Sequence, residues 1–227
     1  PVEGVWEAIA TAEGLMNWFP PKARVEPGVG GKIWTSWGGE FEGSVTIDVW
    51  EPNRRLRYSH PAALGNIGTD SGAEAELPEP IAEDFILEGK RGRTTLRLVH
   101  SGFSRDAAWD TLYDGTVRGW AFELRGLRHY LNHHPGRKRA VAHAQCTLPV
   151  SFEAGWARLM GREGLLAEGT VDGLTEGDAY RVRASTGDAL EGVVAYHNPP
   201  QDFCASVANV DESFLRVKLD NAYSPGA

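Results

Sequence analysis

The stretch TLYDGTVRGWAFELRGLRHYLNHH, residues 111–134, decides the fold class of this chain. Its apolar residues recur at steps of three and four, which is the spacing of one helix face. Trp120 shares that face with Tyr113, Leu124 and Leu127. A long helix with this much aromatic surface needs an apolar partner. The partner is either an ordinary globular core or a curved sheet that leaves a ligand cavity beneath the helix.

Segments with alternating polar and apolar residues precede this helix and predict antiparallel strands. In one of them, GSVTIDVW (43–50), Val45, Ile47 and Val49 are expected on one face. The other strand segments are 30–39, 56–60, 81–89 and 94–103, two short helices are expected near 2–9 and 15–19, and a loop is expected at 61–80. The order of helices, antiparallel strands and one long helix predicts an α+β fold.

Composition and charge exclude several classes of function. The chain has 227 residues, of which 41% are hydrophobic and 24% charged, as in globular proteins. Its net charge of −8 argues against nucleic acid as a partner. No apolar stretch approaches the ~20 residues of a membrane span, and the first residues resemble an amphipathic helix rather than a signal peptide. Cys146 and Cys204 form no disulfide framework, so a cytoplasmic location is expected.

No motif of high catalytic specificity is present, and no cofactor is predicted. His129 and His133 have a spacing that can chelate a metal, but they lie at a fraying helix end, so no metal site is predicted. His100 is the better candidate, because it shares a strand face with Leu96 and Leu98 and needs a polar partner there. The acids of the strand at 81–89, Asp84 and Glu88, are interpreted as solvated.

Several motifs in a fixed order resemble one known family. They are VWEAIATAEGLMNWF (5–19), PGVGGKIW (27–34), the EG–V–EP–LRYS pattern through 42–59, LVHSGF (98–103) and the Gly119-Trp120 pair. With these motifs the first 134 residues resemble the START-like (SRPBCC, helix-grip) superfamily. Within it they are similar to the branch homologous to the activator of the heat-shock-protein-90 ATPase.

The resemblance implies a bent antiparallel sheet around the long helix, with a mostly apolar cavity between them. A hydrophobic or aromatic small molecule is the expected ligand, and a protein partner or a homodimer is the alternative. A polyketide cyclase/dehydratase-like enzyme shares the fold, but the polar residues form no evident acid–base pair, so an enzyme is not favoured. The candidate ligand-binding residues are the aromatic and histidine side chains Trp18, Trp34, Trp37, Tyr58, His60, Phe85, His100, Trp109, Tyr113 and Trp120.

The chain also resembles itself. VEGVWEAIATAEGL (2–15) recurs as FEAGWARLMGREGL (152–165), 150 residues later, and FEGSV (41–45) recurs as LEGVV (190–194), 149 residues later. We therefore expect a START-like domain at 1–136, a linker at 137–150 and a degenerate or incomplete second module at 151–227. No second long helix is predicted, so the second module is expected to need cover from the first.

Overall fold

A computed structural model describes residues 1–38, 41–60, 80–103, 110–147 and 149–220. The chain divides into two compact units, Pro1–Ala140 and Val141–Ala227. The junction lies inside the stretch 137–150 that the sequence predicts as a linker. Each unit is described by itself.

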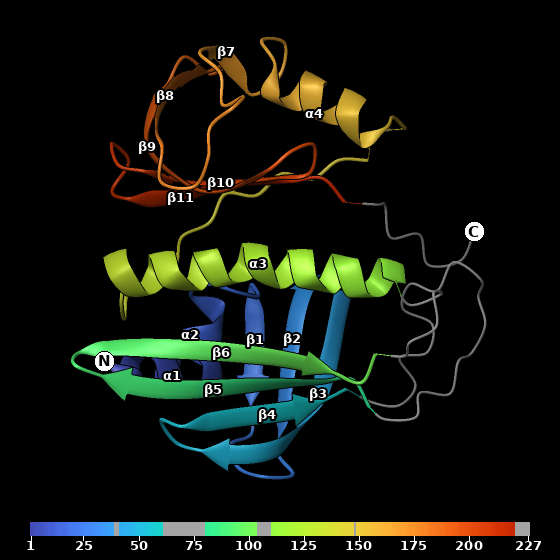
Figure 1. The fold of residues 1–227 in the computed structure, drawn as a ribbon, viewed down its shortest axis with the longest axis vertical. Helices are drawn as coiled ribbons and strands as arrows, with labels where there is room; N and C mark the ends of the chain where they lie inside the picture. Colours follow the sequence, from blue (N-terminus) through green and yellow to red (C-terminus); the bar gives the residue numbers. More distant parts are fainter. Residues whose placement is uncertain (39–40, 61–79, 104–109, 148, 221–227) are drawn as a thin grey trace. The chain divides into compact units, whose positions relative to one another are not determined.

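The first unit is a curled six-stranded antiparallel sheet with a long helix lying along it (Figure 1). The strands follow one another in sequence order across the sheet, from β1 to β6. The elements are α1 (Val2–Ala10), α2 (Ala12–Met16), β1 (Lys22–Val25), β2 (Lys32–Gly38), β3 (Phe41–Glu51), β4 (Arg55–Ser59), β5 (Ala82–Lys90), β6 (Arg93–Ser101) and α3 (Asp110–His133). Only β1 is not foreseen in the sequence, because four residues show too little alternation.

Thr11 and Gly14 form the tight corner between α1 and α2. The Thr11 side chain accepts a hydrogen bond from the Gly14 N–H at 3.0 Å, which caps α2. A Cβ on Gly14 would lie 1.9 Å from the Glu7 carbonyl oxygen, so only glycine allows this approach. The corner brings Trp18 under α1, where its Nε1 donates to the Ala8 carbonyl at 2.9 Å.

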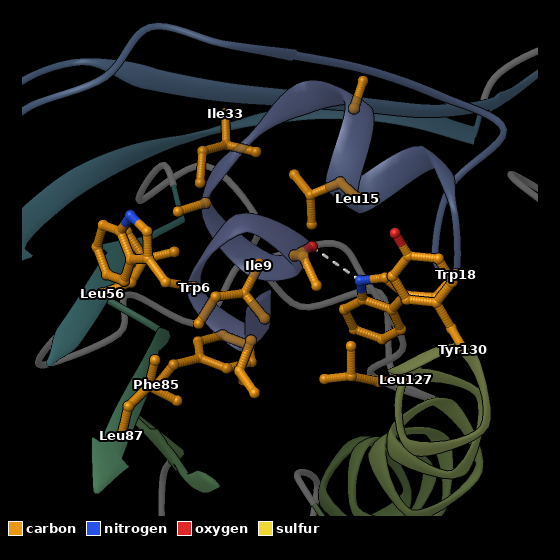
Figure 2. Close-up of a cluster of buried hydrophobic side chains, with 14 of the residues drawn as sticks. Trp6, Ile9, Leu15, Trp18, Ile33, Leu56, Phe85, Leu87, Leu127 and Tyr130 are labelled. Carbon is orange, nitrogen blue, oxygen red and sulfur yellow. Dashed lines mark hydrogen bonds between the residues drawn. The ribbon is translucent and has the colours of Figure 1, made fainter. Parts of the chain in front are cut away.

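The core of the first unit lies between α1, the inner face of the sheet and the C-terminal half of α3 (Figure 2). Trp120 packs against this core, with its ring centroid 5.6 Å from that of Phe85 on β5. The expected orientation of Trp120 toward the sheet is therefore confirmed. The buried core side chains include Trp6, Ile9, Leu15, Trp18, Ile33, Ile47, Leu56, Phe85, Leu87, Leu127 and Tyr130.

A β-bulge at Asp48 changes which residues of β3 face the core. Ile47 pairs with Tyr58 and Val49 with Arg57, so Asp48 is an extra residue on β3. The expected shared face of Val45, Ile47 and Val49 is therefore wrong beyond Ile47. Trp50, rather than Val49, packs against the core, where its ring centroid lies 5.1 Å from that of Trp6.

The second unit begins with one helix and continues as a five-stranded antiparallel sheet, again in sequence order. Its elements are α4 (Phe152–Met160), β7 (Leu166–Glu168), β8 (Ala179–Ala184), β9 (Ala189–Asn198), β10 (Asp202–Val207) and β11 (Ser213–Lys218). It has a buried cluster of its own, which includes Trp156, Met160, Leu166, Val194 and Phe203.

The two sheets have the same strand register. Ile33 pairs with Val45 as Tyr180 pairs with Gly192, and 180 − 33 and 192 − 45 are both 147. The offset of 149 inferred from FEGSV and LEGVV is therefore wrong by two residues, because those letters match out of register.

The bulge and the loop contacts repeat at the same offset. The second bulge is at Ala195, between Val194 and Tyr196. Ile47 exchanges hydrogen bonds of 2.8 Å with Gly30 and Gly31, and Val194 exchanges hydrogen bonds of 2.9 Å with Gly177 and Asp178. In the described residues, the second unit has no counterpart of β6 or α3. The architecture is an α+β helix-grip fold followed by a partial second copy.

Candidate functional site

A row of polar side chains crosses the inner face of the first sheet. Tyr58 on β4 pairs with Glu83 on β5, and Glu83 pairs with His100 on β6. Side chains two residues apart on a strand share a face, and Phe85, two residues from Glu83, is in the core. The row therefore points to the same side of the sheet as the hydrophobic core.

Glu83 is the centre of this cluster. Glu83 is only 5% exposed, and the His60 Nε2 lies 2.9 Å from both oxygens of its carboxylate. An ionised carboxylate only accepts hydrogen bonds, so the His60 ring donates here. The His100 Nε2 lies 3.5 Å from Glu83 Oε1 on the other side. A buried carboxylate is costly unless it is paired, and Glu83 has a histidine on each side.

His100 has no hydrogen-bond partner among the described residues. Its side chain is 16% exposed, and both ring nitrogens are buried without a hydrogen bond from the described residues. Burial lowers the pKa of His100 below its ordinary value of 6.5; Glu83 opposes this effect and His60 adds to it. The ring is therefore neutral at pH 7, with one N–H donor and one acceptor nitrogen.

Tyr58 supplies a hydroxyl beside the same carboxylate. Burial raises its pKa well above the ordinary value of 10.0, and the charge of Glu83 raises it further. The hydroxyl thus keeps its proton at neutral pH. Within the described ranges, no group of three His, Cys, Asp or Glu side chains could hold a metal ion.

Aromatic rings connect this polar cluster with α2, α3 and β2. Consecutive ring centroids lie 5.1 Å apart from Trp37 to Phe19, 5.5 Å from Phe19 to Trp120, 5.6 Å from Trp120 to Phe85, and 5.8 Å from Phe85 to Tyr58. Such separations are typical of favourable aromatic pairs. We call this set the aromatic series. It gives the polar cluster an aromatic neighbourhood drawn from four elements and the turn after α2.

A second set of rings extends from His100. Its centroid lies 4.9 Å from that of Phe103, which lies 5.3 Å from that of Tyr113 on α3. Tyr113 itself is 50% exposed. The structure thus brings together seven of the predicted residues: Trp37, Tyr58, His60, Phe85, His100, Tyr113 and Trp120.

Trp18, Trp34 and Trp109 are the remaining predicted residues. Trp18 is 3% exposed in the core, where its Nε1 donates to the Ala8 carbonyl and its ring stacks on Phe19 of the aromatic series at a centroid distance of 5.1 Å. Trp34 follows the core residue Ile33 and points to the opposite face, where the Arg24 guanidinium lies 4.2 Å from its ring centroid. Trp109 is outside the described residues.

The acidic residue of the polar cluster, Glu83, is not one of the two acids considered in the sequence analysis. Asp84 is not solvated: it faces away from the core and binds Arg55 through two hydrogen bonds of 2.9 and 2.7 Å. Glu83 has the inward position instead. The available signal was its two-residue spacing from Phe85 and Leu87 in IAEDFILEG.

Comparison with known proteins identifies the family. The family model described as "Activator of Hsp90 ATPase homolog 1-like protein" matches residues 1–132. The chain belongs to this family. The cluster, the aromatic series and α3 all come from the matched part, apart from the last residue of α3. The second unit lies outside the match. No curated protein matches the chain.

Solved structures similar to this Hsp90-activator-homologue-like chain are distant. Protein MLL2253 from Mesorhizobium loti is 23% identical, with a TM-score of 0.47 over 59% of this chain and 90% of that one. The Aha1 dimer from Colwellia psychrerythraea is 22% identical, with a TM-score of 0.46 over 57% and 87%. CalU16 from Micromonospora echinospora is 20% identical, with a TM-score of 0.42 over 58% and 69%.

Proposed function

We propose that the first unit binds a small molecule that has a hydrophobic or aromatic body and a polar end. The observation that carries the proposal is His100, whose two buried ring nitrogens have no hydrogen bond from the part of the chain that the structure describes and lie beside the buried carboxylate of Glu83. Buried polar groups are rarely left unpaired, so a ligand is the expected partner. The aromatic series would contact the body of that ligand.

The second unit supports a functional origin for the polar cluster. By register, Tyr58, His60 and Glu83 correspond to Ala205, Val207 and Leu215. The same strands therefore pair in the same way with apolar residues at these positions. A buried charged cluster that the fold does not require is expected to be retained for its chemistry.

A protein-binding role is the second candidate. Trp37 is 48% exposed near the end of β2, and a protein-binding surface would need this ring to be part of a larger exposed apolar patch. The family takes its name from an activator of the Hsp90 ATPase, and the similar Aha1 protein is a dimer. A protein partner or a homodimer would contact this surface rather than the polar cluster.

The second unit has no binding role in this proposal. We infer that residues 151–227 are an incomplete second START-like module that has no ligand site of its own. The apolar residues at the positions of the polar cluster support this inference. A cytoplasmic location is also proposed, because Cys146 and Cys204 are both free thiols. None of the described helices combines the length and hydropathy of a membrane span.

The test compares two aromatic probes that differ by one hydroxyl, 2-naphthol and naphthalene. We expect 2-naphthol to bind about tenfold more tightly, which is the value of one hydrogen bond to a buried polar group. His100→Leu should remove that preference. Arg57→Ala, on the outer face beside Tyr58, should keep it and is the matched control. Equal binding of both probes by the natural chain, or binding of neither, would contradict the proposal.

A further inference from the structure

We propose that His100, oriented by Glu83, is a general base that moves a proton between carbon and oxygen of a bound carbonyl compound. This inference rests on the small-molecule site proposed above and assigns a substrate class to it: ketones with an acidic hydrogen next to the carbonyl and an aromatic or hydrophobic body.

The position of Glu83 selects the tautomer of His100. The Glu83 carboxylate accepts hydrogen bonds, and the nitrogen facing it is Nε2, at 3.5 Å from Oε1. The proton of the neutral ring is therefore assigned to Nε2, which leaves the lone pair on Nδ1. This Nδ1 is buried and has no hydrogen-bond partner among the described residues. A neutral, oriented and unpartnered imidazole nitrogen is the form a general base requires.

His60 and Glu83 are the positioning residues. The His60 ring binds both carboxylate oxygens at 2.9 Å, so it fixes Glu83 from the side away from His100. Glu83 in turn fixes the His100 ring and stabilises its cationic form once a proton has been taken up. A carboxylate that orients a histidine base is a recurrent arrangement in enzymes.

Tyr58 is placed to act on the oxygen of the substrate. It pairs with Glu83 on the strand next to β5, on the other side from His100. Three neighbouring strands put Tyr58 and His100 about 10 Å apart at the backbone. Their side chains extend to the same face, so a small ketone bound across Glu83 would contact both. Its carbonyl oxygen would then receive a hydrogen bond from the protonated Tyr58 hydroxyl.

The proposed step is balanced without any further reactant. His100 Nδ1 takes a proton from the carbon next to the carbonyl, and the C–H electron pair becomes the carbon–carbon double bond of an enolate. The π electron pair of the C=O bond moves to the oxygen, which accepts a hydrogen bond from Tyr58. The imidazolium then returns a proton to carbon or to oxygen. The product is the enol or, when the imidazolium has first exchanged its proton with water, the isotopically exchanged ketone, and His100 is neutral again.

The second unit provides the internal control for this assignment. A structural polar row would be expected in both sheets, because their register and bulges are the same. In the second sheet, the positions of Tyr58 and Glu83 are held by Ala205 and Leu215. The donor and the carboxylate are absent there, and no counterpart of β6 supplies a base within the described ranges.

The experiment uses the full chain and 2-tetralone, an aromatic ketone with acidic hydrogens beside its carbonyl. Proton NMR in D2O follows the loss of the signal from the benzylic protons that lie next to the carbonyl. Quenching of tryptophan fluorescence in the same buffer measures binding. We expect the natural chain to accelerate exchange about 100-fold over an equal concentration of imidazole, the scale of general-base catalysis. His100→Asn should abolish the acceleration while 2-tetralone still binds. Arg57→Ala should exchange at the natural rate.

The pH profile separates the positioning role from a merely structural one. Exchange should rise with pH until His100 is neutral. Glu83→Gln should move this rise to lower pH, because the Glu83 charge is what favours protonated His100. Binding without acceleration, or an unchanged rate in His100→Asn, would overturn the acid–base assignment alone. A chain that binds 2-naphthol but not 2-tetralone would overturn the carbonyl substrate class. Binding of neither probe would overturn the proposed function itself.

Discussion

Glu83 and Leu215 occupy the same position in two sheets of the same register. Glu83 pairs with Tyr58 across β4 and β5, and Leu215 pairs with Ala205 across β10 and β11. Both lie two residues before a core residue, Phe85 in the first unit and Val217 in the second. One backbone arrangement thus holds a buried carboxylate in one unit and a leucine in the other.

The first prediction exchanges the polar cluster for its counterparts. His60→Val and Glu83→Leu together, with the Tyr58 ring kept, should leave the free energy of unfolding of the first unit unchanged or raise it by about 1–4 kcal/mol, because replacing buried charges with apolar residues is often stabilising. Urea unfolding, monitored by tryptophan fluorescence, measures this free energy. The signal reports mainly on the first unit, because seven of the eight tryptophans precede Ala140. A loss above about 2 kcal/mol would show that the fold itself needs the cluster.

The second prediction concerns pH. His100 has a lowered pKa in the folded chain, so below about pH 6.5 the unfolded chain binds more protons at this position. Its contribution to stability is therefore complete above pH 6.5 and is lost as the pH falls toward the folded-state pKa. NMR titration of the His100 ring should show the lowered midpoint. Unfolding of the natural chain and His100→Asn should differ in slope in this range, and identical slopes would contradict the prediction.

The third prediction concerns Trp120. Because Trp120 is only half-buried and contacts Phe19 and Phe85 through ring edges and tilted faces, Trp120→Ala should cost about 2 kcal/mol. Trp6→Ala should cost about 3–5 kcal/mol, because Trp6 is 8% exposed in the core. Urea unfolding of both variants gives the comparison. Equal losses would mean that Trp120 is packed as tightly as the core.

The fourth prediction tests the joint between α2 and α3. The Tyr130 hydroxyl accepts hydrogen bonds from Asn17 Nδ2 at 3.2 Å and from the Gly136 N–H at 3.0 Å. Tyr130→Phe should cost about 1–3 kcal/mol, since it leaves both donors without this partner. Tyr113→Phe, at an exposed position of the same helix, is the control. If thermal unfolding does not distinguish the two variants, the hydrogen bonds of the Tyr130 hydroxyl do not contribute to stability as predicted.

The fifth prediction concerns the second unit alone. Residues 141–227 should fail to fold as a cooperative, soluble monomer, because a short chain without a long helix buries only a modest core. Circular dichroism with urea and size-exclusion chromatography test this. A monomer with a single sharp transition would show that the unit needs no cover, and the prediction would then be wrong.

Much of the fold could be predicted because its signals are local. The spacing of apolar residues in 111–134 determined the long helix, and alternation with tight turns determined the β5–β6 hairpin. The inward direction of Trp120 followed from the same helical period. The repeat of Trp6 at Trp156 indicated the second copy, because helix patterns survive divergence without any pairing partner.

Other features depend on pairing between distant segments, which no local period contains. One extra residue at Asp48 reverses the faces beyond it, so Trp50 rather than Val49 packs inward. The joining of Phe19, Trp120 and Phe85 across about 100 residues is likewise a result of tertiary packing. The sequence by itself determined that His100 would need a partner. Only the register of three strands decided that the carboxylate beside this ring is Glu83, because a shift of one residue would have turned the carboxylate to the other face.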